Sequence, residues 1–136
     1  MPYRLFHRLF FVLLLVSVFS GIAKAQDPAA DARQFADNEW KLFDAGSFAK
    51  MYDTTFDDSM KQGMTRDQSL NMLDATLKQR GSMINRTLAS KTNSMGLYRF
   101  IYSTQCSGGK VFEDITVTKK ADDWKVVGIY VRPNLE

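Results

Sequence analysis

The constellation best suited to chemistry is a single carboxylate among aromatic side chains. Glu113 alternates with Val111, Ile115 and Val117, so it is expected on the apolar face of a strand. The aromatic residues expected beside it on neighbouring strands are Tyr98, Phe100, Tyr102 and Tyr130. A carboxyl group in an apolar hollow has a raised pKa, and a nearby phenol can donate a hydrogen bond to a developing oxyanion, as in ketosteroid isomerase. One hypothesis is therefore a proton-abstracting enzyme with Glu113 as base and Tyr102 or Tyr130 as donor.

The same residues also fit a purely structural interpretation. Residues 61–110 hold eight basic and two acidic side chains, a net charge of plus six. In this part of the chain Arg80, Arg86 and Arg99 could form an electropositive rim that holds an anion. Alternatively, Glu113 lies near the rim of the sheet and pairs with Arg86 or Arg99, because perturbed acids also arise in structural ion pairs. In that interpretation the tyrosines belong to an ordinary core.

The residue inventory excludes several other kinds of site. The one histidine, His7, lies near the N-terminus in an expected signal peptide, so the mature domain has no base for a Ser–His–Asp or Cys–His arrangement. Zinc would lack its usual ligands, because Cys106 is also the sole cysteine and is expected to be buried. No glycine-rich phosphate loop is present; Gly108-Gly109 is read as a hairpin turn. We expect no metal and no cofactor.

Residues 1–25 have the pattern of a secretory signal peptide. Arg4 and Arg8 precede an apolar run, Leu9–Phe19, and small residues occupy the cleavage positions of Ala23-Lys24-Ala25. The apolar stretch is shorter than the about 20 residues of a membrane-spanning helix. We therefore expect cleavage after Ala25, a periplasmic or secreted protein without a stable membrane anchor, and one domain spanning residues 26–136.

Cleavage would also change the charge of the protein. Three of the 18 lysines and arginines lie in the signal segment, which leaves 15 against 15 aspartates and glutamates. The mature chain would therefore be neutral. A neutral domain lacks the basic surface on which non-specific binding to nucleic acid depends, so we expect no nucleic-acid partner.

The last third of the chain alternates with the period of a β-sheet. Three runs, Leu97–Cys106, Lys110–Lys120 and Trp124–Arg132, are separated by short turns and predict antiparallel hairpins. A first strand is expected at Met83–Ala89, followed by a polar connection at Lys91–Met95. In the final run, Trp124, Val126 and Tyr130 are expected on one face, and Val127, Ile129 and Val131 on the other. Both faces are then apolar, so a second copy of the chain or other contacts of this chain must cover the outer one.

Three helices are expected before the sheet. After a loose leader at Gln26–Ala30, a helix from Asp31 should end at Gly46, and a second should run from Ser47 to Gly63. Thr65 and Gln68 form a capping box that opens a third helix, which Gly81 closes. The predicted fold is α+β, with three N-terminal helices packed on a curved four-stranded antiparallel sheet whose open end leaves a cone-shaped cavity.

Most of the mature chain, from about Ala32 to Val131, resembles an exported bacterial family called domain of unknown function 4019. The similar residues are Trp40-Lys41-Leu42-Phe43-Asp44-Ala45-Gly46-Ser47-Phe48, Tyr52, Arg80-Gly81, Arg86-Thr87-Leu88, Tyr98, Glu113 and Trp124-Lys125-Val126-Val127-Gly128-Ile129-Tyr130. The chain departs from the family at Gln68 or Ser69, where the family has tryptophan, and at Ile129, where it has an aromatic residue. The resemblance implies a cone-shaped fold like nuclear transport factor 2, also called cystatin-like, and export. It implies no established reaction.

Three functional hypotheses follow. The first is an exported, non-catalytic binding or accessory domain of uncharacterised role, which holds a small ligand in its cavity or a protein on its sheet face. The residues that could contact a ligand are Glu113, Tyr98, Tyr102, Tyr130, Arg86 and Arg99. The second is the proton-abstracting, isomerase-type enzyme, and the third is a periplasmic inhibitor or immunity-type protein that acts through its charged surface. A homodimer is compatible with each of them.

Overall fold

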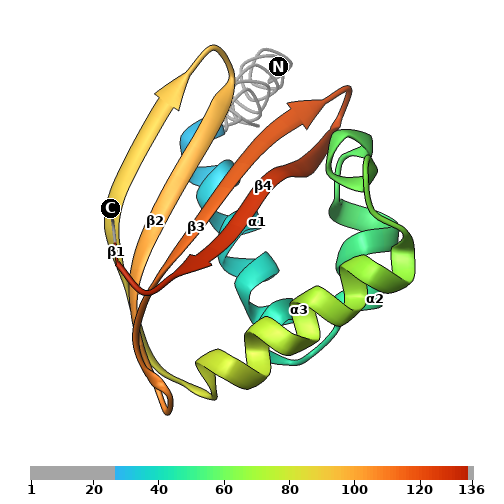
Figure 1. Cartoon of the computed structure of the whole chain (residues 1–136). Coiled ribbons are helices and arrows are strands. Elements are labelled where there is room, and N and C mark those ends of the chain that lie inside the picture. The colour runs from blue at the N-terminus through green and yellow to red at the C-terminus, as the bar shows by residue number, and fades with distance from the viewer. Residues whose placement is uncertain (1–26, 135–136) are drawn as a thin grey trace, which may run out of the picture.

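The computed structural model describes residues 27–134, in which helices precede one four-stranded antiparallel sheet (Figure 1). The helical segments are α1 (Pro28–Asp44), α2 (Phe48–Lys50), the π-helix η1 (Met51–Thr55), the 3-10 helix η2 (Asp58–Lys61) and α3 (Arg66–Arg80). The strands β1 (Met83–Ser94), β2 (Leu97–Cys106), β3 (Gly109–Lys120) and β4 (Asp123–Arg132) are neighbours in chain order. The α+β architecture is therefore as the sequence predicts. The expected signal peptide lies outside the described residues.

The first helix begins earlier than its apolar spacing suggests. Asp27 caps it, since its side chain accepts a hydrogen bond from the Ala29 N–H at 3.0 Å, and Pro28 occupies the first turn. The expected loose leader through Ala30 is wrong for this reason. The side chains that α1 buries are Ala32, Ala36, Glu39, Trp40 and Phe43.

Residues 48–61, which we call the strap, replace the single second helix that we expected. Three α-helical residues pass into the π-helix η1, and the chain then extends at Phe56 and Asp57 before η2. There the Asp57 N–H donates to the Val126 carbonyl at 2.9 Å, and Phe56 forms a parallel bridge with Val126. The strap thus covers the edge of β4 around Val126, near the start of the strand (Figure 1).

The predicted capping box of α3 is confirmed. Thr65 Oγ1 accepts from the Gln68 N–H at 3.2 Å, and Gln68 Oε1 accepts from the Thr65 N–H at 2.9 Å. Gly81, with φ of 80°, ends the helix. The helix therefore begins and ends at the residues that the sequence indicates.

Strand β1 extends further than predicted. The polar segment expected as a connection at Lys91–Met95 continues the strand to Ser94, and the turn is Met95-Gly96, both with positive φ. β1 is an edge strand and most of its side chains are exposed. Its sequence therefore carries no apolar alternation that could have marked its length.

A bulge in β4 reverses the predicted facing of its second half. Val126 pairs with Val117 but Gly128 pairs with Thr116, so Val127 is an extra residue. Ile129 and Val131 consequently pack on the core, and Tyr130 lies on the outer face with 58% of its surface exposed. The prediction that Tyr130 shares a face with Val126 is wrong, because the alternation of side chains shifts by one residue at the bulge.

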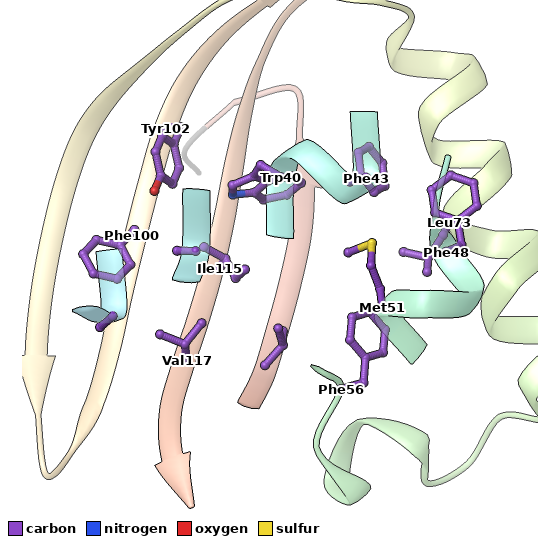
Figure 2. Close-up of a cluster of buried hydrophobic side chains, with 13 residues drawn as sticks. Trp40, Phe43, Phe48, Met51, Phe56, Leu73, Phe100, Tyr102, Ile115 and Val117 are labelled. Carbon is purple, nitrogen blue, oxygen red and sulfur yellow. The ribbon is translucent and has the colours of Figure 1, made fainter. Parts of the chain in front are cut away.

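The core lies between α1 and the inner face of the sheet (Figure 2). Trp40, Phe43 and Met51 meet Ile115 and Val117, and all five are at most 1% exposed. The Trp40 and Phe43 rings pack edge to face with centroids 5.5 Å apart. The inner face of β3 is thus covered by helices, as the sequence required.

The end of α3 is held against the β2–β3 turn by close backbone contact, and substitution of Gly108 should reveal it. The Gly108 N–H donates to the Arg80 carbonyl at 3.0 Å, and a Cβ at Gly108 would lie 2.6 Å from that oxygen. Gly108→Ala should therefore cost about 1–3 kcal/mol in free energy of unfolding, measured in urea. Gly128→Ala is the matched control, because its Cβ would have no contact shorter than 3.5 Å. Equal losses in the two variants would contradict the close approach.

Candidate functional site

Four charged side chains meet where α1 and α3 end against the sheet. Asp44 is the last residue of α1, Arg80 is the last of α3, and Arg86 and Glu113 come from the inner face of β1 and β3. We call this group the ion cluster. It contains two acids and two bases, so its formal charges cancel.

Glu113 is at the centre of the ion cluster and is completely buried. Its Oε2 accepts from Arg80 Nη1 at 2.6 Å and from Arg86 Nη2 at 3.1 Å. Its Oε1 accepts from Arg86 Nε at 2.9 Å. Charge-assisted bonds from two planar guanidinium groups therefore hold both carboxylate oxygens in place.

Asp44 closes the ion cluster on the side nearer to water, where its side chain is 21% exposed. It accepts from Arg80 Nη2 at 2.8 Å and from Arg86 Nη1 and Nη2, each at 2.9 Å. Burial alone would raise the pKa of Asp44, but these hydrogen bonds outweigh it and lower the pKa below its ordinary value. Burial alone would likewise lower the pKa of Arg86, and the bonds to Asp44 and Glu113 raise it instead.

Aromatic rings of α1 pack on the two arginines. The Arg80 guanidinium carbon lies 5.0 Å from the Phe43 ring centroid, and that of Arg86 lies 5.5 Å from Trp40. These cation–π contacts join the ion cluster to the apolar core. Within residues 27–134, two buried side-chain polar atoms have no hydrogen-bond partner, Trp40 Nε1 and Thr104 Oγ1.

Two surface hollows flank the ion cluster. One of about 430 Å³ is lined by Asp44 together with Leu77, Gly81 and Met83 of the α3–β1 junction. The other, of about 290 Å³, is lined by Arg80 and by Val111 and Val131 of the sheet. Arg80 is ion-paired with both Glu113 and Asp44. The member of the ion cluster that lines each hollow is therefore already paired.

Of the six residues predicted to form a ligand site, the structure brings Glu113, Arg86 and Tyr102 together and places the other three elsewhere. Glu113 and Arg86 are bonded, as the ion-pair interpretation proposed, whereas Arg99 lies on the outer face and donates to Asp114 at 2.9 Å. The suggested Arg99–Glu113 pair is wrong, because Arg99 lies opposite Thr116 in the register and faces away from Glu113. Tyr102 is opposite Glu113, but its hydroxyl donates to Asp37 Oδ1 at 2.6 Å.

The two remaining tyrosines lie away from Glu113. Tyr98 packs edge-on against Trp124, with centroids 5.5 Å apart, and Tyr130 is on the outer face. Neither is placed to donate a hydrogen bond to a substrate beside Glu113. The arrangement predicted for proton abstraction therefore lacks its Tyr130 donor, and its Tyr102 donor is engaged by Asp37.

The sequence reasoning missed a second buried acid, Glu39 of α1, which is 1% exposed. Thr55 Oγ1 lies 2.9 Å from its Oε2, and burial raises the pKa of Glu39 to about 7. Its position could have been found, because it lies three residues after Ala36 and four before Phe43, on the apolar stripe of the helix. Asp44 was named only among the residues of the family resemblance, and Arg80 only there and in the alternative of an anion-holding rim; the structure buries Arg80.

Other kinds of site find no support in the described part of the chain. No group of three His, Cys, Asp or Glu residues there could hold a metal ion. Cys106 is free and buried, and burial raises the pKa of its thiol. No helix within residues 27–134 is long and apolar enough to cross a membrane.

Comparison with known proteins identifies the fold. No family model matches the chain, and no curated protein sequence matches it. Among solved structures, a five-substitution variant named Rd1NTF2_05 aligns with a TM-score of 0.54 at 16% identity, over 77% of this chain and 99% of its own. A Campylobacter jejuni protein named as an NTF2-like transpeptidase aligns with a TM-score of 0.52 at 16% identity, over 69% of this chain and 94% of its own.

Proposed function

We propose that this domain is a small exported binding module and that its polar interior has a structural role. Its fold is like that of nuclear transport factor 2, which can serve for ligand binding or for isomerase chemistry. The observation that carries the proposal is the saturation of Glu113 by three hydrogen bonds from Arg80 and Arg86. A general base must reach the proton that it abstracts, and Glu113 is 0% exposed.

The environments of Cys106, a potential nucleophile, and of the Tyr102 phenol support the same proposal. Cys106 is 1% exposed and its thiol pKa is raised, so it lacks the accessible thiolate that covalent catalysis requires. The isomerase-type alternative needs a phenol beside an unpaired acid, and Tyr102 is bonded to Asp37. Such chemistry would first have to break the ion cluster.

The binding surface that we propose is on the outer face of the sheet, opposite the helices (Figure 1). Its residues, which we call the outer patch, are Arg99, Lys110, Phe112, Tyr130 and Arg132. Arg132 stacks over Tyr130 at 5.2 Å and Lys110 over Phe112 at 5.2 Å, so aromatic surface and positive charge lie together. Aromatic residues and arginine are the side chains enriched in protein interfaces.

The charge of the outer patch indicates the kind of partner. Two of its three cations, Arg99 and Arg132, pair with one acid, Asp114, which is buried beneath them. An acidic protein surface would complement the patch, whereas a second copy of this chain on a twofold axis would oppose like charges. This favours a partner other than itself, and it also fits the inhibitor or immunity-type alternative. Export and membership of the family called domain of unknown function 4019 are parts of the proposal that rest on the sequence.

Native mass spectrometry of the full chain expressed in its own host tests both the export and the protein partner. The chain should have the mass of residues 26–136 and should retain a second protein. Tyr130→Ala with Arg132→Glu should lose that protein, because both stacked side chains of the outer patch are removed. Met95→Ser is the control, since Met95 is 99% exposed at the β1–β2 turn and is not a residue of the outer patch. A retained small molecule that survives the outer-patch substitutions, or a second copy of the chain, would contradict the acidic protein partner.

A further inference from the structure

Glu39 is a buried acid outside the ion cluster, and it connects α1 with the strap. Its Oε2 is 2.9 Å from Thr55 Oγ1, in the π-helix η1. Among the described residues, Glu39 has no ion-pair partner within bonding distance. A buried carboxylate with one hydroxyl contact is poorly compensated, so burial favours the protonated form.

The hydrogen count at Thr55 also favours the protonated acid. Thr55 Oγ1 is 2.9 Å from the Met51 carbonyl as well as 2.9 Å from Glu39 Oε2. A hydroxyl has one hydrogen to donate, and a carbonyl oxygen can only accept. Both short contacts are therefore hydrogen bonds at the same time only if Glu39 carries a proton and donates it to Thr55.

The Met51 carbonyl also closes the π-helical turn. It accepts the Phe56 N–H at 2.9 Å, and the next residue, Asp57, is bonded to Val126 of β4. Single π-helical turns are rare, and those that do occur are often at functional positions. The bonds from Glu39 through Thr55 therefore end at the Met51 carbonyl. This carbonyl also holds Phe56, next to the residue that bonds the strap to β4.

The charged groups around Glu39 are few. From α2, the Lys50 ammonium lowers the pKa of Glu39, but burial has the larger effect and raises it. On α1 itself, Arg33 and Asp37 pair with each other and with Tyr102 of β2. The ion cluster begins about 7.5 Å further along the helix, at Asp44, which is paired with Arg80 and Arg86. On the side of the strap and the sheet, Asp57 pairs with Lys120, and Lys125 donates to the Thr54 carbonyl.

We propose that Glu39 and Thr55 form a proton-controlled latch that holds the strap closed over the edge of β4. With the proton on Glu39, two hydrogen bonds run in series and fix the π-helical turn. When the proton is lost, Thr55 must donate to the carboxylate and gives up its bond to Met51. The strap then opens more often, which lets the carboxylate reach water and exposes the β4 edge. The latch is a property of residues 39–57 and does not depend on the proposed partner.

Hydrogen exchange of the full chain between pH 5 and pH 8.5, followed by mass spectrometry, tests the latch. After correction for intrinsic exchange, peptides of the strap should lose about 40-fold in protection from pH 5 to pH 7, and little above pH 7.5, because one proton is released on opening. Peptides of β2 and β3 exchange through global unfolding, so they should stay far more protected than the strap at every pH. Glu39→Gln should remove the pH dependence, since the amide donates to Thr55 at every pH. Asp58→Asn, at an exposed acid of the strap, should keep it.

Thr55→Val provides an independent variant, because it removes the hydroxyl and keeps the shape of the side chain. Its strap should be weakly protected at pH 5 as well as at pH 8. The latch would be overturned by strap protection that does not change with pH in the wild type, or by a pH profile that Glu39→Gln retains. A carbon-13 titration in which Glu39 ionises near 4.5 would overturn it without any variant.

Discussion

Glu113→Gln should lower the free energy of unfolding by about 3–5 kcal/mol, the cost of removing one partner from a buried ion pair. The variant leaves Arg80 and Arg86 buried with one carboxylate, Asp44, between them, and Arg80 is 1% exposed in its side chain. Urea unfolding followed by circular dichroism measures the loss. A catalytic acid held in an open hollow would show the opposite trend, because its neutral form is easier to bury than its charged form.

Asp53→Asn is the control for Glu113→Gln. Asp53 forms a bidentate pair with Arg66, at 2.9 and 2.8 Å, but both side chains are about half exposed. Exposed pairs contribute about 0–1 kcal/mol, so this substitution should change stability little. If Glu113→Gln costs no more than Asp53→Asn, the ion cluster does not stabilise the fold.

Glu39→Gln should stabilise the protein above pH 7 by about 3 kcal/mol. The pKa of Glu39 is raised from 4.5 to about 7 by burial, and each unit corresponds to about 1.4 kcal/mol. In the wild type, an acid with a raised pKa in the folded state binds its proton more tightly there than in the unfolded chain. Its favourable contribution is therefore complete below pH 4.5 and is lost as the pH rises to about 7. Glutamine has no proton to lose, so the advantage of the variant should grow between pH 4.5 and 7 and then stay constant.

The acid side of the stability profile should depend on other carboxylates. The bonds from Arg86 and Arg80 lower the pKa of Asp44 despite its burial, and bonds from Lys120 and Ser59 lower the pKa of Asp57. Their contributions are present above pH 3.8 and are lost as the pH falls further. Urea unfolding at half-unit steps should place maximum stability of the wild type near pH 4–5. Equal pH profiles for wild type and Glu39→Gln would contradict the account of Glu39.

The elements that the sequence predicted well are those with local signals. The limits of β2 and the capping box at Thr65 depend on residues within a few positions of each other, and the structure confirms both. The polar extension of β1 to Ser94 has no such signal, because an exposed edge strand needs no apolar alternation. The bulge at Val127 is set by pairing with β3, and the π-helix at Met51–Thr55 by contact with α1 and β4.

The site was only partly predictable for the same reason. The apolar alternation of β3 placed Glu113 on the inner face and made Arg86 a reasonable partner, and the two are bonded. Arg80 and Asp44 are 36 residues apart in sequence and come together only when two helix ends meet over the sheet. Periodicity within a single element cannot show which helix end faces which strand, so these two partners required the structure.

A double-mutant cycle between Arg86 and Glu113 tests the central claim most directly, namely that Glu113 is a paired structural acid. Urea unfolding of Glu113→Gln, Arg86→Met and the double variant gives the coupling free energy of the two side chains. The account predicts coupling of about 2 kcal/mol or more, with the double variant less destabilised than the sum of the single variants, because removal of both charges leaves neither of them buried alone. A coupling free energy near zero would show that Arg86 does not hold Glu113, and would contradict the account.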